Sequence, residues 1–529
     1  MKTRPVISLV LNAHTPFVRS LDLAYTPEER WFFESLSETY LPLLEVFDRL
    51  DADHIPFKMG ISLSPILCHL LSDEFLLNRY LEYTDKRIEF GVRELERTAG
   101  EPELWNLAKL FYDQLVDRRI TFTERYGMNI LRVFEYYQKK GRVEILTTAA
   151  TYGFLPFYTP YPEAVQAQLE VAASSYRSFF GRYPQGFWLP ELGWSPEIEG
   201  YLRSYNFGYT LIDTPGLVFA NPHAIKGSFY PAKTPMGVLI LARDYYAAEA
   251  ITHRDYGFAR DRVYRAYYED AGYELPAELV KPFLNNHGER TPTGYKYRCP
   301  RGARRPVYNP RLAAEKAAEQ ACSFLNARIQ SLEAAGAYMD EPAVCLCAYD
   351  ADTFGRFWYE GCQFLESLFR EGAKKTDVQF MTPAEYLYKQ DAASFQTLTP
   401  EFSSWETNGY AEAWLDASND WMYRHIIRSL DRMIELAERF PDDTGLKERA
   451  LNQAAREILL ALSSDWPKIL YKQESAEFAR NQIEGSLRNF TTIYEALGSK
   501  YISTEWLTSL ERRHNLFPAI NYRVFRRKK

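Results

Sequence analysis

Residues 186–196 read G-F-W-L-P-E-L-G-W-S-P, a short apolar run that ends abruptly at Glu191. Pro190, Gly193 and Pro196 prevent this segment from continuing as a regular strand or helix. The pattern therefore predicts a buried strand that carries a carboxylate at its end.

A second strand of this kind is expected further along the chain. Val344 to Tyr349 is apolar, and Asp350 follows it in the sequence D-A-D-T-F-G-R-F-W-Y-E-G. Glycosidic bond cleavage needs one carboxyl group to protonate the leaving oxygen and another to meet the oxocarbenium-like carbon. Indole rings beside such a pair provide flat apolar platforms for sugar rings. The two strand ends indicate sugar chemistry, although acids at strand ends and helix caps are more often structural.

The first 390 residues alternate between apolar strands and helical segments, which is typical of a parallel sheet or a (β/α) barrel. Further strands are predicted at residues 5–11, 57–62, 143–148, 209–213, 238–241 and 378–381. Residues 67–140 are predicted to be a helical insertion between strands. We expect a barrel domain over residues 1–390, a linker over 391–415 and an all-helical C-terminal domain over 416–529.

Residues 214–237 carry four prolines and three glycines. This density of helix and strand breakers predicts a long loop. Long loops in compact domains are often functional, so we interpret this one as a lid; an inert excursion is the alternative.

The composition excludes several classes of protein. The chain has 529 residues, of which 46% are hydrophobic and 25% charged, as in soluble globular proteins. The net charge of -7 argues against a nucleic-acid partner. The six cysteines form no C-x-x-C pair, which favours reduced thiols in a cytoplasmic protein. No segment approaches the roughly 20 apolar residues that a membrane-spanning helix needs.

Motifs for other chemistries are missing from the sequence. It has no H-E-x-x-H and no cluster of histidines and cysteines, so we expect neither a catalytic metal nor a cofactor. The absence of a G-x-S-x-G elbow, a Walker loop and a Rossmann glycine fingerprint argues against serine hydrolases, nucleotide-binding enzymes and redox enzymes.

The two carboxylate motifs resemble those of a known family. W-L-P-E-L-G-W-S-P is similar to the nucleophile motif of glycoside hydrolase family 57, usually W-L-P-E-C-A-Y-x-P. D-A-D-T-F-G-R-F-W-Y-E-G resembles its acid/base motif, usually D-T-E-L-F-G-H-W-W-F-E-G. The resemblance runs from L-N-A-H-T-P-F-V near the start to S-S-D-W-P near residue 465, and is greatest to the 1,4-alpha-glucan branching enzymes of the family. It implies a distorted (β/α)7 barrel in which Glu191 is the nucleophile and Asp350 the general acid/base.

The resemblance also implies a set of substrate-binding residues. These are Asn12, His14, Trp31, Tyr152, Tyr230, Arg243, Trp358, Trp405, Trp414 and Asp465. Trp405 and Trp414 belong to the linker, which is expected to line the cleft. Tyr230, on the predicted loop, is expected to assist transfer.

Four positions depart from the pattern of the family. Asn12 stands where the first histidine of H-x-H is usual, and Tyr152 replaces the histidine of A-T-H-G. Thr252 replaces the tryptophan of Q-V-W, and Arg260 replaces a glycine of G-Y-P-G-D. The last two changes bear on binding of the acceptor and so on branching.

Three functions agree with this sequence. The first is a retaining branching enzyme that acts on an α-glucan, in which Asp350 begins protonated because Glu191 and an apolar wall that includes Phe354 and Trp358 raise its pKa. The second is an α-amylase or a 4-α-glucanotransferase with the same two carboxyl groups. The third is a glucan-binding protein without catalysis.

Overall fold

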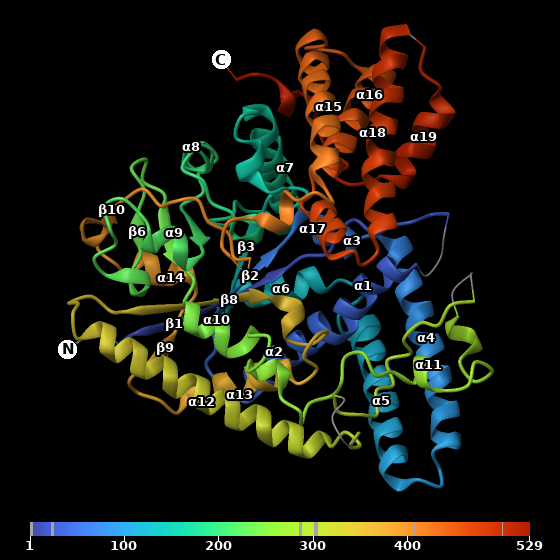
Figure 1. The fold of residues 1–529 in the computed structure, drawn as a ribbon, viewed down its shortest axis with the longest axis vertical. Coiled ribbons are helices and arrows are strands. Elements are labelled where there is room, and N and C mark those ends of the chain that lie inside the picture. Colours follow the sequence, from blue (N-terminus) through green and yellow to red (C-terminus); the bar gives the residue numbers. More distant parts are fainter. Residues whose placement is uncertain are drawn as a thin grey trace.

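The computed structural model describes residues 4–22, 26–284, 288–300, 305–406, 408–499 and 501–528. Its centre is a curled sheet surrounded by helices (Figure 1). Parallel strands run in the spatial order β7-β5-β4-β3-β2-β1-β8. Their bounds are Val6–Ala13 (β1), Met59–Leu63 (β2), Val143–Thr148 (β3), Gly186–Trp188 (β4), Tyr209–Ile212 (β5), Leu239–Ala242 (β7) and Val344–Asp350 (β8). The predicted strands are confirmed, with ends that shift by one or two residues.

A single parallel bridge closes the sheet between its two outermost parallel strands. Arg243, directly after β7, pairs with Leu346 of β8, and the N–H of Asp244 donates a hydrogen bond to the Leu346 carbonyl at 2.8 Å. The predicted distorted (β/α)7 barrel is therefore confirmed. Residues of β1 are buried along the whole strand, as expected where helices cover a parallel sheet.

Helices fill the connections between the strands. Before β4 they are α1 (Pro27–Ser35), α2 (Leu41–Ala52), α3 (Pro65–Leu70), α4 (Glu74–Arg97), α5 (Pro102–Ile120), α6 (Ile130–Lys139) and α7 (Pro162–Phe180). After β4 follow α8 (Ile198–Ser204), α9 (Thr214–Val218), α10 (Tyr245–Thr252), α11 (Ala271–Glu274), α12 (Pro310–Gly336), α13 (Gly361–Ala373) and α14 (Pro383–Tyr388). In Figure 1, α4 and α5 project from the sheet as a long helical pair within the segment predicted as an insertion.

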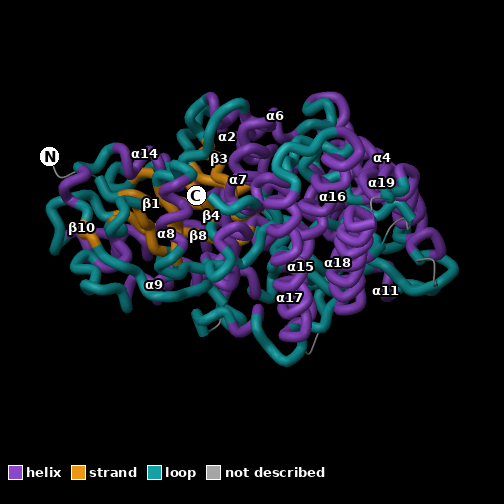
Figure 2. The backbone as a smooth tube through the Cα atoms, turned by 90° about the horizontal axis from the view of Figure 1, so that it is seen from above, coloured by secondary structure: helices purple, strands orange, loops and turns teal. Residues whose placement is uncertain are grey.

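The C-terminal part of the described chain is helical. It consists of α15 (Asp420–Arg439), α16 (Gly445–Ala461), α17 (Asp465–Lys472), α18 (Ala476–Ser499) and α19 (Thr504–Arg513). Met422, Ile426 and Leu430 of α15 are fully buried, as their helical spacing predicts. Figure 2 shows the strands in one half of the molecule and α15, α16 and α18 in the other. Of these C-terminal helices, α17 lies nearest to the sheet in Figure 1.

The predicted long loop over residues 214–237 is largely irregular, but three short elements interrupt it. The segment contains α9, a 3-10 turn at Gly227–Phe229 and strand β6 (Ala232–Lys233). Strand β6 pairs antiparallel with β7 and parallel with β10 (Gln396–Thr397). The prolines and glycines interrupt helices and long strands, but short strands between them still form hydrogen bonds with neighbouring backbone. A short strand β9 (Gln379–Phe380) pairs parallel with Val6 and Ile7 at the start of β1.

Among the described residues, none of the helices combines the length and apolarity that crossing a membrane requires.

Candidate active site

The segment after β4 holds Glu191 in an unusual backbone conformation. Glu191 has φ 57° and ψ 23°, and Leu192 has φ 49°, so two consecutive side-chain-bearing residues occupy the left-handed region. Such a conformation costs about 1–3 kcal/mol per residue and is concentrated at functional sites. It turns the Glu191 side chain into the protein, where only 4% of the residue is exposed.

The Glu191 carboxylate is bound on both oxygens. The Lys468 ammonium lies 3.0 Å from Oε1 and 2.9 Å from Oε2. The indole Nε1 of Trp405 donates to Oε2 at 2.5 Å, and the Trp405 N–H donates to the Glu191 carbonyl at 3.0 Å. Contacts of this kind fix the carboxylate in one orientation.

Asp350 is the last residue of β8 and lies in a different environment. It is in register with Asn12 of β1, whose Nδ2 donates to Asp350 Oδ1 at 3.1 Å. The residue is exposed at one side, but the surrounding protein removes enough water to raise the pKa of Asp350. Lys468, Asn12 and His14 lower this pKa, and Asp352 raises it. The direction of the shift is the expected one, but the negative charge that contributes to it is that of Asp352, where the sequence analysis named Glu191.

Tyr152 connects the two carboxylate segments. Its hydroxyl accepts hydrogen bonds from Asn12 Nδ2 at 2.8 Å and from the Glu191 N–H at 3.4 Å. Burial and the charges of Glu191 and Asp350 raise the pKa of Tyr152 well above its usual value, so the phenol stays neutral. The C-terminal ends of β1 and β8 and the segments after β3 and β4 thus meet at one edge of the sheet.

The predicted residues His14 and Asp465 also belong to this group. The His14 ring stacks on Tyr152 with ring centres 3.9 Å apart. Its Nε2 lies 3.0 Å from Asp465 Oδ2, and its Nδ1 lies 2.9 Å from Ser64 Oγ. Helix α17, which begins at Asp465, therefore reaches the edge of the barrel sheet.

Arg243 contacts the site through Trp405. Its guanidinium lies 5.4 Å from the centre of the Trp405 ring, and its Nε donates to Asp213 Oδ1 at 2.8 Å. The arginine is therefore held by a carboxylate from the neighbouring strand end, beside the indole that binds Glu191.

Three tryptophans and Tyr230, all predicted to bind substrate, instead pack against other side chains. Trp358 is 1% exposed and packs on Phe354, so its ring offers no free face to a sugar. Trp414 is fully buried and stacks on Phe154 with ring centres 5.0 Å apart. Trp31 packs edge-on against Phe478 of α18.

Tyr230 is the fourth of these residues. It is 3% exposed, its hydroxyl lies 2.6 Å from Ser394 Oγ, and its ring packs against Phe395. The hydroxyl is thus engaged near strand β10 and not at the carboxylate pair.

Two positions that depart from the family pattern lie on the segment after β7. Thr252 is the exposed last residue of α10, and its hydroxyl donates to the Ala248 carbonyl at 2.9 Å. Arg260 is exposed in a 3-10 turn at Phe258–Arg260. The Thr252 side chain does not supply the aromatic face of the tryptophan that the family pattern has at this position.

Lys468 and Glu406 are site residues that the sequence analysis missed. Glu406 follows Trp405, and its Oε1 lies 3.6 Å from the Lys468 ammonium. Lys468 is three residues after Asp465 in α17, so helical spacing places both on one face. That spacing was a usable signal, but nothing in the sequence identified the partner of the lysine.

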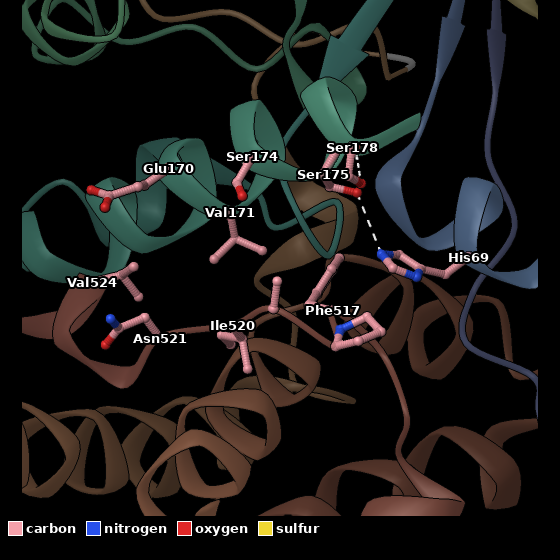
Figure 3. Close-up of a pocket in the computed structure, with 12 residues that line it drawn as sticks. His69, Glu170, Val171, Ser174, Ser175, Ser178, Phe517, Ile520, Asn521 and Val524 are labelled. Atoms are coloured by element: carbon pink, nitrogen blue, oxygen red, sulfur yellow. Dashed lines mark hydrogen bonds between the residues drawn. The ribbon is translucent and has the colours of Figure 1, made fainter. Parts of the chain in front are cut away.

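A separate cavity of about 140 Å³ lies between α7 and the C-terminal segment (Figure 3). Its lining includes His69, Ser175, Phe517 and Ile520. Burial lowers the pKa of His69 to about 4, and its Nε2 lies 3.4 Å from Ser175 Oγ. None of the predicted site residues lines this cavity, so it is not part of the carboxylate site.

Comparison with known proteins gives matches over nearly the whole chain. Residues 8–398 match Glycosyl hydrolase family 57, and residues 425–525 match the C-terminal region of 1,4-alpha-glucan branching enzymes. A 1,4-alpha-glucan branching enzyme of Thermococcus kodakarensis is 25% identical, over 97% of this chain and 77% of that protein.

Solved structures agree with these matches. The alpha-amylase AmyC of Thermotoga maritima is 33% identical over the full length of both chains, with a TM-score of 0.93. A family 57 type branching enzyme of Pyrococcus horikoshii is 24% identical, with a TM-score of 0.88, over 100% of this chain and 98% of that one. The resemblance seen in the two carboxylate motifs is confirmed, and the chain belongs to glycosyl hydrolase family 57.

Proposed function

We propose that the protein is a retaining 1,4-alpha-glucan branching enzyme that makes α-1,6 branches by double displacement. The observation that carries the proposal is the unequal pair of carboxyl groups at one edge of the barrel. Glu191 is buried and paired with Lys468, whereas Asp350 is exposed on one side and has a raised pKa. One group is thus suited to attack carbon and the other to donate a proton.

In the first step Glu191 attacks C1 of an α-1,4-linked glucose unit. The bond between C1 and the glycosidic oxygen breaks, and Asp350 gives its proton to that oxygen. The products are a glycosyl ester on Glu191, an ionised Asp350 and a shortened glucan chain.

In the second step Asp350 takes a proton from the 6-hydroxyl of an acceptor glucan. The acceptor oxygen attacks C1 and releases Glu191, so two inversions retain the α configuration. The match of residues 425–525 to the C-terminal region of branching enzymes supports this choice of acceptor.

An α-amylase is the second candidate function, because the relative with 33% identity is an alpha-amylase. Both activities use the same first step and differ only in the acceptor, which is water for an amylase. The replacement of an aromatic platform by Thr252 is consistent with weaker acceptor binding and favours this candidate.

Incubation of the purified protein with amylose tests the proposal. Iodine staining, reducing ends and α-1,6 linkages by proton NMR are followed together. Falling stain with new α-1,6 signals and few reducing ends is the expected result. Rising reducing ends would identify an amylase, redistribution of chains without α-1,6 signals a 4-α-glucanotransferase, and no change would favour a glucan-binding protein.

A further inference from the structure

Lys468 is the only cation among the contacts described for Glu191. Its ammonium contacts both carboxylate oxygens of Glu191 and lies 3.6 Å from Glu406 Oε1. It also lies 5.5 Å from the centre of the Trp414 ring. The side chain is 22% exposed, so water screens these charges only in part.

The same ammonium acts on both carboxyl groups of the proposed mechanism. Burial alone would lower the pKa of Lys468, but Glu191, Asp350 and Glu406 together raise it above its usual value. The charge of Lys468 in turn lowers the pKa of Asp350. Lys468 therefore remains charged and interacts electrostatically with each group.

We propose that Lys468 is a positioning residue that serves as the shared counter-ion of Glu191 and Asp350 throughout the double displacement. This inference rests on the proposed function and adds a role for α17, which lies outside the barrel sheet. Two hydrogen bonds from one ammonium hold the Glu191 carboxylate in place before it attacks.

One cation can compensate both carboxyl groups because only one of them is negatively charged in each state of the reaction. Before attack Glu191 is negative and Asp350 neutral; after attack Glu191 is a neutral ester and Asp350 is negative, because its proton has moved to the leaving oxygen. The negative charge thus passes from one carboxyl group to the other, and the net charge of the site is unchanged. Lys468 contacts Glu191 and interacts electrostatically with Asp350, so its charge is compensated in each state.

Glu406 gives Lys468 a second partner when the Glu191 carboxylate is consumed. An ammonium left without a counter-charge in a partly buried site would be destabilised. Glu406 lies within ion-pairing distance on the side of the linker, so Lys468 is retained at the site while the glycosyl ester exists.

Variants of Lys468 test the inference with two substrates. Lys468→Met removes the ammonium, and Lys468→Arg keeps the charge. Lys472→Met is the matched control because Lys472 is the exposed last residue of the same helix. α-Maltosyl fluoride serves as the first substrate, since fluoride leaves without a proton from Asp350 and kcat/KM then reports the attack by Glu191 alone. Amylose is the second substrate.

For α-maltosyl fluoride we expect K468M to lower kcat/KM by about 100-fold, the usual effect of a displaced reacting group. K468R should recover most of this loss, and K472M should match the wild type. For amylose, K468M should also move the basic limb of the kcat/KM profile to higher pH. Asp350 acts in its protonated form, and loss of the lysine charge raises the pKa of Asp350, so the acid persists to higher pH.

Burial, Lys468, Asn12, Asp352 and His14 set the pKa of Asp350, and Tyr40 and Tyr152 also interact with its charge. Only Lys468 changes, so a shift of the basic limb reports its charge. A thermal unfolding midpoint close to that of K472M shows that K468M is folded. K468R with no recovery, or a folded K468M with unchanged kcat/KM and pH profile, would overturn the inference. A wild type that releases no fluoride would overturn the proposed function as well.

Discussion

The C-terminal ends of β4 and β8 occupy equivalent places in the parallel sheet, but their carboxyl groups differ in burial, backbone conformation and contacts. Glu191 is buried in a left-handed backbone conformation and is held by Lys468 and Trp405. Asp350 has extended backbone, is exposed on one side and accepts a hydrogen bond from Asn12. Its pKa is raised because protein replaces water around it. The environment of each strand end, and not the residue type, therefore sets the role of its carboxyl group.

Removing the charge of Glu191 should have the largest effect. Glu191→Gln keeps the size of the side chain and one oxygen for the Trp405 indole, but it abolishes the nucleophile. We expect turnover of amylose to fall by about 10⁴- to 10⁶-fold, as for other lost nucleophiles. Binding of a maltooligosaccharide, measured by calorimetry, should remain nearly intact. Unchanged turnover would refute the assignment of Glu191.

Replacement of Asp350 should have a smaller effect that depends on the substrate. Asp350→Asn removes the proton donor, so turnover of amylose should fall by about 10²- to 10⁴-fold. The first step with α-maltosyl fluoride should be nearly unaffected, because fluoride needs no protonation. Azide should restore release of the enzyme-bound sugar as a glycosyl azide. Equal losses on amylose and on the fluoride would contradict the assignment of an acid/base role.

The sequence was a good guide to what lies along the strands. Val143 to Thr148 was predicted to the residue, and Glu191 and Asp350 were placed at strand ends as observed. Apolar runs and breakers are local features, so the sequence displays them directly.

The sequence did not predict the contacts between residues that lie far apart along the chain. Lys468 is 277 positions from Glu191 along the chain, and no local pattern joins them. Trp358 sits in a motif that suggested a sugar platform, but its burial depends on packing against other elements. Strand β6 could not be predicted from the sequence either, because its two residues form a strand only by pairing with neighbours such as β7.

Replacement of Asn12 should test, through the pH dependence of the reaction, how the surroundings of Asp350 set its pKa. Its amide donates to Asp350 and lowers the pKa of that carboxyl, so Asn12→Leu should raise it. Because Asp350 works as a protonated acid, the basic limb of kcat/KM for amylose should move to higher pH. Loss of the hydrogen bond should lower the maximal rate by about tenfold, equivalent to a net 1.4 kcal/mol. An unmoved basic limb would show that Asn12 does not act on the acid.

Tyr230 should give the smallest effect, because it lies apart from both carboxylate segments. Its hydroxyl pairs with Ser394, so Tyr230→Phe should lower the free energy of unfolding by about 1 kcal/mol. Ser394→Ala removes the other half of the same hydrogen bond and is the matched control. Urea unfolding measures this loss of stability. The yield of α-1,6 linkages from amylose should stay within about twofold of the wild type, because neither substitution changes Glu191 or Asp350.

A different result for Tyr230→Phe would change the view of residues 214–237. If branching fell by more than about tenfold in Y230F but not in S394A, the phenol itself would be needed during transfer. The segment would then have to leave its pairing with β7 and β10 to carry Tyr230 to the carboxylates, as a lid does. Equal and small effects in both variants would assign Tyr230 to the stability of this sheet edge and leave the selection of the acceptor to the residues around Asp350.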